Sequence, residues 1–277
     1  MNSGVKHTTA YDVIVMIIMV ILAVLFIFPV YWIVTGSFKD AAAINAAIPE
    51  WFPKNPTTDN YVRLFAKPAM QWLFNSVFIA LMSMGLTCIT AAMAGYALAK
   101  KRFVGRGMLF TFLVCAMALP KQVVLVPLLK EMSFLGLHDS VWAVILPTVG
   151  WPFGVFLMKQ FSETIPTEML EAVRIDGAGE IQTFLTIVLP IVKPGIGALA
   201  IFTFITTWND YFLQLIMLNS SKNLTIALGI AKLQAEMSND FGLIMAGAAL
   251  GAIPIITIFL LFQKYFTQGI TMGAVKG

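Results

Sequence analysis

Long apolar runs that contain no charged residue dominate the sequence. Four of them cover residues 13–38, 68–99, 140–158 and 241–263, and each is bounded by charged side chains. A helix needs about 20 mostly apolar residues to cross the hydrocarbon core of a bilayer. The four runs therefore predict four transmembrane helices.

Two further apolar runs each contain one charge. Lys121 directly follows Pro120, so we expect a helix that ends near the proline and a short apolar segment beyond it, with the lysine reaching the membrane surface. Asp210 lies within the other run, at a depth where a charge must face protein or water. Counting both runs, the sequence predicts an all-α, polytopic membrane protein with six transmembrane helices in a single domain, 1–277. The six spans are expected at about 13–36, 71–99, 107–128, 140–159, 194–218 and 241–263.

The composition supports a membrane protein and excludes several other classes. Hydrophobic residues make up 59% of the chain and charged residues 12%, whereas soluble domains average about 25% charged residues. The net charge of +4 is small and scattered, which argues against a nucleic-acid partner. The two cysteines and two histidines form no disulfide framework or metal motif, and no catalytic serine motif is present. We therefore expect no catalytic residues and no metal site.

The orientation follows from the lysines and arginines of the short loops. The loop 100–106 carries four positive charges and no acid, so we place it in the cytoplasm. Both termini, the loop 160–193 and the tail 264–277 then lie on the cytoplasmic side. On the opposite side, segment 40–69 is rich in proline and aromatic residues, and two interpretations stay open for it: a packed lid and a surface for a soluble partner. The first apolar run exceeds the roughly 7–15 residues of a signal peptide, so we expect it to be retained.

The segment between the fourth and fifth spans predicts ordered structure. Pro166 suits the start of a helix, which we expect to run to Arg174. Gly177 then permits a sharp turn. Residues 181–189 carry apolar side chains at helical spacing, which predicts a second, amphipathic helix that ends at Pro190.

The same segment contains a spaced set of residues: E-A-V, three residues, G, nine residues, I, one residue, L-P. The positions are Glu171, Ala172, Val173, Gly177, Ile187, Leu189 and Pro190. This set resembles the EAA loop of permease subunits of ATP-binding-cassette (ABC) importers, and only Val173 departs from it. Residues 208–211 and the ending 273–277 resemble the carbohydrate-uptake branch of that family, and in particular the second, smaller permease of the maltose type.

The resemblance implies a transport function. It implies the type I ABC importer permease fold, and a subunit that moves a sugar or oligosaccharide into a bacterial or archaeal cell across its (inner) membrane. The chain has no phosphate-binding loop of the form G-x-x-x-x-G-K-[ST], so it holds no cofactor itself, and ATP and Mg²⁺ are expected on a separate dimer of ABC ATPases. The other expected partners are a second homologous permease, an extracellular or periplasmic sugar-binding protein, and membrane lipid.

The resemblance also assigns roles to residues of the EAA loop. It implies that the loop sits in a groove of the ATPase, with Glu171 making polar contacts and Gly177 allowing the tight approach. Leu170, Val173 and Ile181 are expected to fill the groove. The full candidate set for coupling is Leu170, Glu171, Ala172, Val173, Asp176, Gly177, Ile187, Leu189 and Pro190. The tail residues Val275, Lys276 and Gly277 are expected to reach the ATPase dimer.

A few polar and aromatic residues are candidates for the substrate path. Aromatic faces stack on sugar rings, and an amide beside a carboxylate can hydrogen-bond neighbouring hydroxyls, while an ionisable residue inside a span is a functional candidate by default. The candidates are Trp208, Asn209, Asp210 and Asn75. Helix packing, with Asp210 paired to a donor, explains the same residues, and both interpretations stay open.

The main alternative is a secondary transporter or channel that has no ATPase partner. Such a protein is expected to show several ionisable residues inside the membrane and an internal repeat with broken helices. The sequence shows one such residue, Asp210, and no repeat, and the EAA spacing would remain unexplained.

Overall fold

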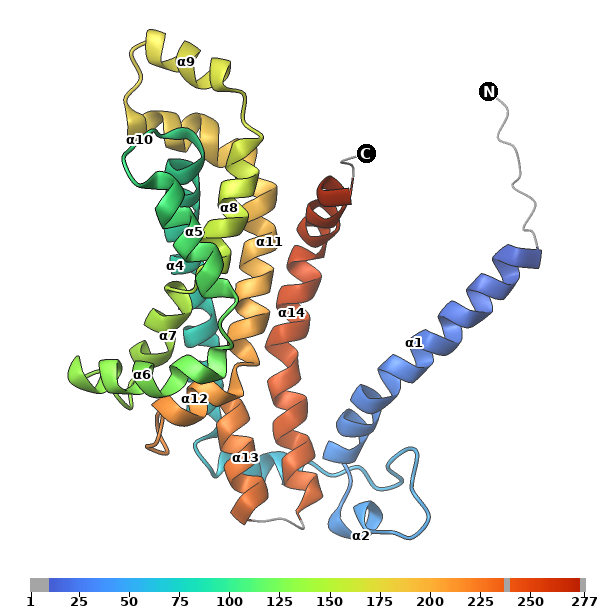
Figure 1. The fold of residues 1–277 in the computed structure, drawn as a ribbon. Helices are drawn as coiled ribbons and strands as arrows, with labels where there is room; N and C mark the ends of the chain where they lie inside the picture. The colour runs from blue at the N-terminus through green and yellow to red at the C-terminus, as the bar shows by residue number, and fades with distance from the viewer. Residues whose placement is uncertain (1–9, 237–239, 275–277) are drawn as a thin grey trace. The chain divides into compact units, whose positions relative to one another are not determined.

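The computed structural model describes residues 10–236 and 240–274, and within them every regular element is helical. The predicted tail contacts at Val275, Lys276 and Gly277 lie outside the described residues. The helices are α1 (Ala10–Ser37), α2 (Ala41–Ile44), α3 (Asp59–Phe65), α4 (Ala69–Lys100), α5 (Arg106–Met117), α6 (Lys121–Phe134), α7 (Trp142–Val149), α8 (Phe153–Glu163), α9 (Thr167–Ile175), α10 (Glu180–Thr183), the π-helix η1 (Phe184–Val188), α11 (Leu189–Trp208), α12 (Tyr211–Met217), α13 (Ile226–Glu236) and α14 (Phe241–Ala274) (Figure 1).

The chain divides into two compact units. One contains the residues up to Lys67 and Ile230–Leu250, and the other contains Pro68–Gly229 and the residues from Gly251 onward. In the first unit the buried amide of Asn60 donates to the carbonyls of Ser37 (3.0 Å) and Lys39 (2.8 Å) and so fixes α3 to the end of α1. The second unit contains the predicted EAA loop and Asp210, and the sites described below belong to it.

The segment 40–69 packs within the first unit and still presents aromatic surface. Tyr31 donates its hydroxyl to the carbonyl of Trp51 (2.6 Å), and the Trp51 ring lies 6.1 Å from that of Trp32. Trp51 and Phe52 nevertheless remain 65% and 71% exposed. The segment therefore packs on the end of α1, and both interpretations, a packed lid and a surface for a soluble partner, stay open.

Among the residues that the structure describes, five helical segments are long and apolar enough to cross a membrane, or six if a bent pair counts as one span. The bent pair is α5 and α6, and the chain direction bends by 108° between them. α5 has 12 residues and rises about 18 Å, well short of the roughly 30 Å of a bilayer core. The helix end expected near Pro120 is observed, because proline disfavours helical geometry in the residue before it. The apolar segment beyond it is a second helix.

The fifth apolar run differs most from the prediction. The amphipathic helix was expected to end at Pro190, but α10, η1 and α11 form one continuous candidate span, Glu180–Trp208. In η1 the backbone N–H of Leu189 donates to Phe184, five residues back. This shift in hydrogen-bond register accommodates Pro190, because proline has no N–H to donate to the carbonyl four residues back. The helix then ends at Trp208, ten residues earlier than the predicted limit at 218, and α12 follows after a break.

The core of the second unit depends on close backbone approach to α8. A Cβ on Gly95 of α4 would lie 2.6 Å from the backbone of Lys159, and a Cβ on Gly195 of α11 would lie 2.5 Å from the ring of Phe161. Small residues at these positions let both helices pack directly on α8, as is common between membrane helices. The α4, α8 and α11 helices therefore form the rigid centre of this unit.

Asp139 joins two loops at the end of the second unit where α6 and α12 lie. Its carboxylate accepts the backbone N–H groups of Asn219 (2.8 Å) and Ser220 (3.0 Å) and the Ser220 hydroxyl. Burial alone would raise the pKa of Asp139, but the hydrogen bonds from Ser220 and Asn219 outweigh it and lower the pKa from 3.8 to about 2. The ionised carboxylate therefore stabilises the folded loops.

We expect Asp139→Asn to lower the free energy of unfolding by about 1–2 kcal/mol at neutral pH, because charge-assisted hydrogen bonds are replaced by neutral ones. Asparagine tolerates the positive φ of 58° at this position, so backbone strain stays the same. The folded pKa lies below the unfolded value, so the wild-type contribution is complete above about pH 4 and is lost as the pH falls toward 2. Melting temperatures of both proteins across this pH range measure the effect. Equal melting temperatures at neutral pH would contradict it.

Candidate functional site

The α9–α10 knob, residues 167–183, has the geometry of two helices joined by a glycine turn. The N–H of Gly177 donates to the carbonyl of Arg174 (3.0 Å), and the N–H of Ala178 donates to that of Val173 (3.2 Å). This is a Schellman turn, in which Gly177 adopts a left-handed φ of 83°. Gly177 therefore sets the direction in which the chain leaves α9, as the sequence predicts.

The apolar side chains of the knob separate into a buried and an exposed group. Leu170 is only 5% exposed and belongs to a core cluster with Tyr96 and Val188. The prediction that Leu170 fills a groove on the ATPase is therefore wrong, because α9 buries this side chain against its own chain. Ile175 and Ile181 are 86% and 77% exposed. Sequence reasoning missed Ile175 because this residue ends α9. No further helical residues follow it whose spacing would show which side of the helix it lies on.

The charged residues of the knob also form two groups. The carboxylate of Glu180 pairs with Arg174 (2.9 Å) and with Lys101 at the end of α4, which fixes the knob to the helix bundle. Glu171 and Asp176 are exposed, and within the described residues their side chains make no hydrogen bond or ion pair. The knob therefore presents two large apolar side chains beside uncommitted carboxylates, which suits contact with another protein.

The remaining EAA positions support the knob from within or lie at its surface. Ile187 is partly buried against the core cluster, and Leu189 is half-buried. Ala172 and Pro190 are exposed, and Val173 is half-buried. The motif therefore combines residues that shape the knob with residues that it exposes.

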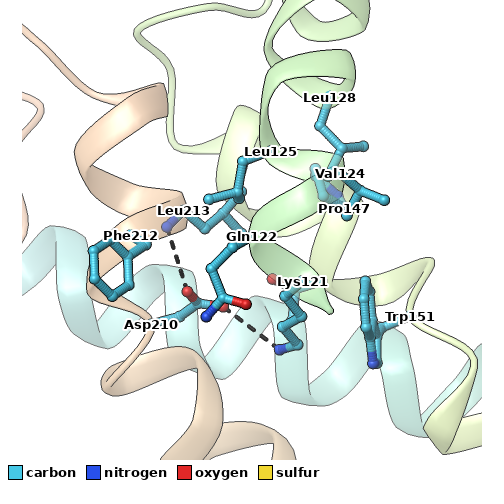
Figure 2. A pocket seen from close by; sticks show the side chains of 11 residues that line it. Lys121, Gln122, Val124, Leu125, Leu128, Pro147, Trp151, Asp210, Phe212 and Leu213 are labelled. Carbon is cyan, nitrogen blue, oxygen red and sulfur yellow. Dashed lines mark hydrogen bonds and ion pairs between the residues drawn. The ribbon is translucent and has the colours of Figure 1, made fainter. Parts of the chain in front are cut away.

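A second cluster forms where three helices are interrupted. Lys121 begins α6, Trp151 lies between α7 and α8, and Asp210 lies between α11 and α12. Nζ of Lys121 is 3.5 Å from Oδ2 of Asp210 and 5.0 Å from the centroid of the Trp151 ring. Asp210 also caps α12 by accepting the N–H of Leu213 (3.3 Å). Figure 2 shows the lysine between the carboxylate and the indole.

This helix-break site, defined by Lys121, Trp151 and Asp210, borders two cavities. One of about 70 Å³ is lined by all three residues together with Gln122, and an adjacent one of about 200 Å³ is lined by Lys121 and Trp151 with several threonines. An aromatic face, an ammonium, a carboxylate and hydroxyls in one place suit a ligand rich in hydroxyl groups. Breaks in membrane helices are where transporters commonly build such sites.

Asp210 is the only predicted path residue that belongs to the helix-break site. Trp208 stacks on Phe204 with ring centroids 5.7 Å apart, and the amide of Asn209 donates to the carbonyl of Ile205. Asn75 is buried, and its amide is occupied by the carbonyls of Lys222 and Leu224 (2.8 and 2.9 Å) and by the Gln71 amide (2.9 Å). In this structure Asn75 holds a loop in place and is closed to a ligand, so the interpretation as helix packing applies to it.

Sequence reasoning missed Lys121 and Trp151. Lys121 was expected at the membrane surface, and Trp151 was not considered. The signal was present in both cases, since Lys121 follows Pro120 and Trp151 stands between Gly150 and Pro152, so each lies at a helix break. What the sequence could not show is that these breaks meet each other and the one at Asp210.

The comparison with known proteins begins with a family match. The family described as "Binding-protein-dependent transport system inner membrane component" matches residues 88–272. The chain belongs to this family. The arabinooligosaccharides transport system permease protein AraQ of Bacillus subtilis is 33% identical, and the alignment covers 97% of each chain. The maltodextrin transport system permease protein MdxG of the same organism is 34% identical over 93% of each chain.

The fold is also found in a solved structure. A chain of a bacterial ABC transporter involved in the import of the acidic polysaccharide alginate superposes with a TM-score of 0.83 at 21% sequence identity, covering 96% of this chain and 100% of the other. These findings confirm the predicted all-helical permease fold and the resemblance to ABC importer permeases. The chain is a multi-pass membrane component of a transport system, and its family is one of permeases rather than enzymes.

The same findings decide against the main alternative. Broken helices and a second ionisable residue, Lys121, are present at the helix-break site, but the internal repeat that a secondary transporter is expected to show is not seen in the sequence. The family match accounts for them without that function, because it covers most of the chain, including the knob and the helix-break site. Helix breaks alone therefore did not discriminate between the two kinds of transporter.

Proposed function

We propose that the chain is the smaller permease subunit of an ABC importer for an oligosaccharide, and that it couples to separate ATPase subunits through the α9–α10 knob. The observation that carries the proposal is Ile175, which is 86% exposed and lies one helical turn from Glu171, a carboxylate that makes no hydrogen bond or ion pair within the described residues. Large apolar side chains with a polar rim are typical of protein interfaces. ATP and Mg²⁺ then belong to the partner ATPase dimer, and closure of that dimer moves the knob.

The proposed substrate is a neutral oligosaccharide. The relatives named for arabinooligosaccharides and maltodextrin support this class. At the helix-break site the charges of Lys121 and Asp210 balance each other, which favours an uncharged, hydroxyl-rich ligand over an acidic one. The other partners in this proposal are a second homologous permease and an extracellular or periplasmic sugar-binding protein. The positive charge of loop 100–106 supports an orientation with both termini in the cytoplasm.

Gly177→Pro tests the coupling role. Proline cannot adopt the φ of 83° at this position and removes the N–H that closes the turn, so we expect the knob to lose its shape and the ATPase to be lost from the complex. The chain is co-expressed with its genetic neighbours and purified through a tag on this subunit. The amounts of ATPase and second permease that copurify are measured.

Gly136→Pro is a matched control. Gly136 also has a left-handed φ, 70°, donates its N–H three residues back (3.1 Å), and has open space around it, but it lies in the loop after α6. It is expected to retain the ATPase. A wild-type subunit that purifies without any ATPase, or two variants that behave alike, would overturn the proposed coupling.

A further inference from the structure

A large apolar groove lies beside α4 in the second unit, and at the knob it is lined by Glu180 and the exposed Ile181. Its volume is about 740 Å³, within the roughly 300–1,000 Å³ of ligand sites. Apolar side chains of α4, α10, η1 and α11 line it, among them Ile89, Met93, Phe184, Leu185 and Ile196. Ile89, Met93 and Leu185 are 59%, 57% and 53% exposed, so the groove is open along its side. The helices α4 and α11 that line the groove are both candidate membrane spans.

One end of the groove is charged. Among the described residues that line the groove, only Lys101 and Glu180 are ionised, and the Lys101 ammonium lies 5.1 Å from the centroid of the Tyr96 ring. The carboxylate of Glu180 is already paired with both Lys101 and Arg174. The end of the groove therefore combines an apolar channel with a polar, cationic rim.

Further cations next to this end have no acidic partner. Nζ of Lys100 donates to the backbone carbonyls of Glu163 (3.2 Å) and Ile165 (2.6 Å), and the guanidinium of Arg106 donates to the carbonyl of Lys101 (3.1 Å). Arg102 is exposed, and within the described residues it makes no ion pair. Carbonyl oxygens do not neutralise these charges, and the nearby carboxylate of Glu163 is paired with Lys159 (2.6 Å), so the rim carries an excess of positive charge.

We propose that this groove binds an anionic phospholipid, with an acyl chain along α4 and the phosphate at Lys101 and Arg102. Basic pockets between membrane helices are suited to anionic headgroups, and the apolar channel suits the acyl chain. A water-soluble ligand has no reason to enter a groove that opens to the membrane. A helix of another subunit would cover the apolar channel but leave the excess cations unbalanced. That the lipid comes from the cytoplasmic leaflet rests on the orientation given under the proposed function. The match between the groove and an anionic phospholipid does not depend on that orientation.

The experiment measures bound lipid on the purified complex. The complex is exchanged into detergent with dioleoyl phosphatidylglycerol or with dioleoyl phosphatidylcholine, and retained lipid is counted by native mass spectrometry. The wild type is expected to retain phosphatidylglycerol at least five-fold more than phosphatidylcholine. Lys101→Gln combined with Arg102→Gln is expected to remove this preference, because the acyl chain keeps its channel while the phosphate loses its cations.

A matched pair of α4 variants tests the groove itself. Met93→Trp fills the groove and is expected to reduce retained phosphatidylglycerol at least five-fold, whereas Met70→Trp, equally exposed on the same helix but outside the groove, is expected to leave it unchanged. Equal retention of the two lipids by the wild type, or unchanged retention in Met93→Trp, would overturn the proposal. Loss of the second permease from Met93→Trp with no loss of lipid would instead identify a protein occupant. ATPase copurification with the wild type and with Met93→Trp, in which Lys101 and Glu180 are unchanged, reports separately on the proposed function.

Discussion

Replacing Ile175 with aspartate is expected to reduce ATP-driven sugar uptake at least ten-fold. Ile175 is 86% exposed at the end of α9, so the substitution leaves the fold of this chain intact. In the proposed interface with the ATPase, the aspartate places a charge where an apolar side chain is buried, and the loss of a central interface residue typically costs about 2 kcal/mol or more. Uptake in proteoliposomes and the amount of ATPase retained by the purified complex measure the effect.

Two controls separate coupling from stability. Val104→Asp makes the same chemical change at a fully exposed residue in the loop after α4, and it is expected to leave uptake unchanged. Leu170→Ala removes a side chain that is 5% exposed, so it is expected to lower the free energy of unfolding by about 2–3 kcal/mol. The coupling role would be refuted if Ile175→Asp kept full uptake, or if it lowered the melting temperature as much as Leu170→Ala.

Lys121→Glu is expected to lower the uptake rate at least ten-fold without loss of the ATPase. The ammonium of Lys121 balances the carboxylate of Asp210 at 3.5 Å and lies over the Trp151 ring. A glutamate there brings two carboxylates together, which disfavours their joint ionisation and opens the helix-break site. A ten-fold loss corresponds to about 1.4 kcal/mol in the rate-limiting barrier. Uptake and ATP hydrolysis are measured on the same reconstituted complex.

Lys121→Arg provides the matched control, because it keeps the charge and the ion pair. It is expected to retain at least half of the uptake rate. If arginine and glutamate reduce uptake equally, the ion pair is not what the site requires. If Lys121→Glu retains uptake, the helix-break site lies outside the substrate path, and Asp210 serves only to cap α12.

The knob was predictable because its signals are local. The turn at Gly177 and the helix after Pro166 depend on residues within one or two turns of each other. Leu170 was assigned wrongly because its burial depends on Tyr96 of α4 and Val188 of η1. The spacing of apolar residues within α9 does not reveal contacts with these distant residues.

The helix-break site could not be predicted for a related reason. Lys121, Trp151 and Asp210 are separated by 30 and 59 positions in the sequence, and each is explained by its own neighbours when read alone. Their meeting depends on the packing of α12 against α6 and α7, which come from distant parts of the sequence. Pro190 was predicted wrongly for a different reason. A proline is compatible both with a helix end and with a π-helical turn, and only the folded backbone shows that the π-helical turn is formed here.

The continuous helix from Glu180 to Trp208 gives the molecule a mechanical property. Its 29 residues span about 43 Å, from the knob at one end to the break at Asp210 at the other. Figure 1 shows α10 and α12 at opposite ends of this rod. Because successive turns of a helix are joined by backbone hydrogen bonds, we expect a displacement at α10 to reach Trp208, two residues before the partner of Lys121, through the helix itself.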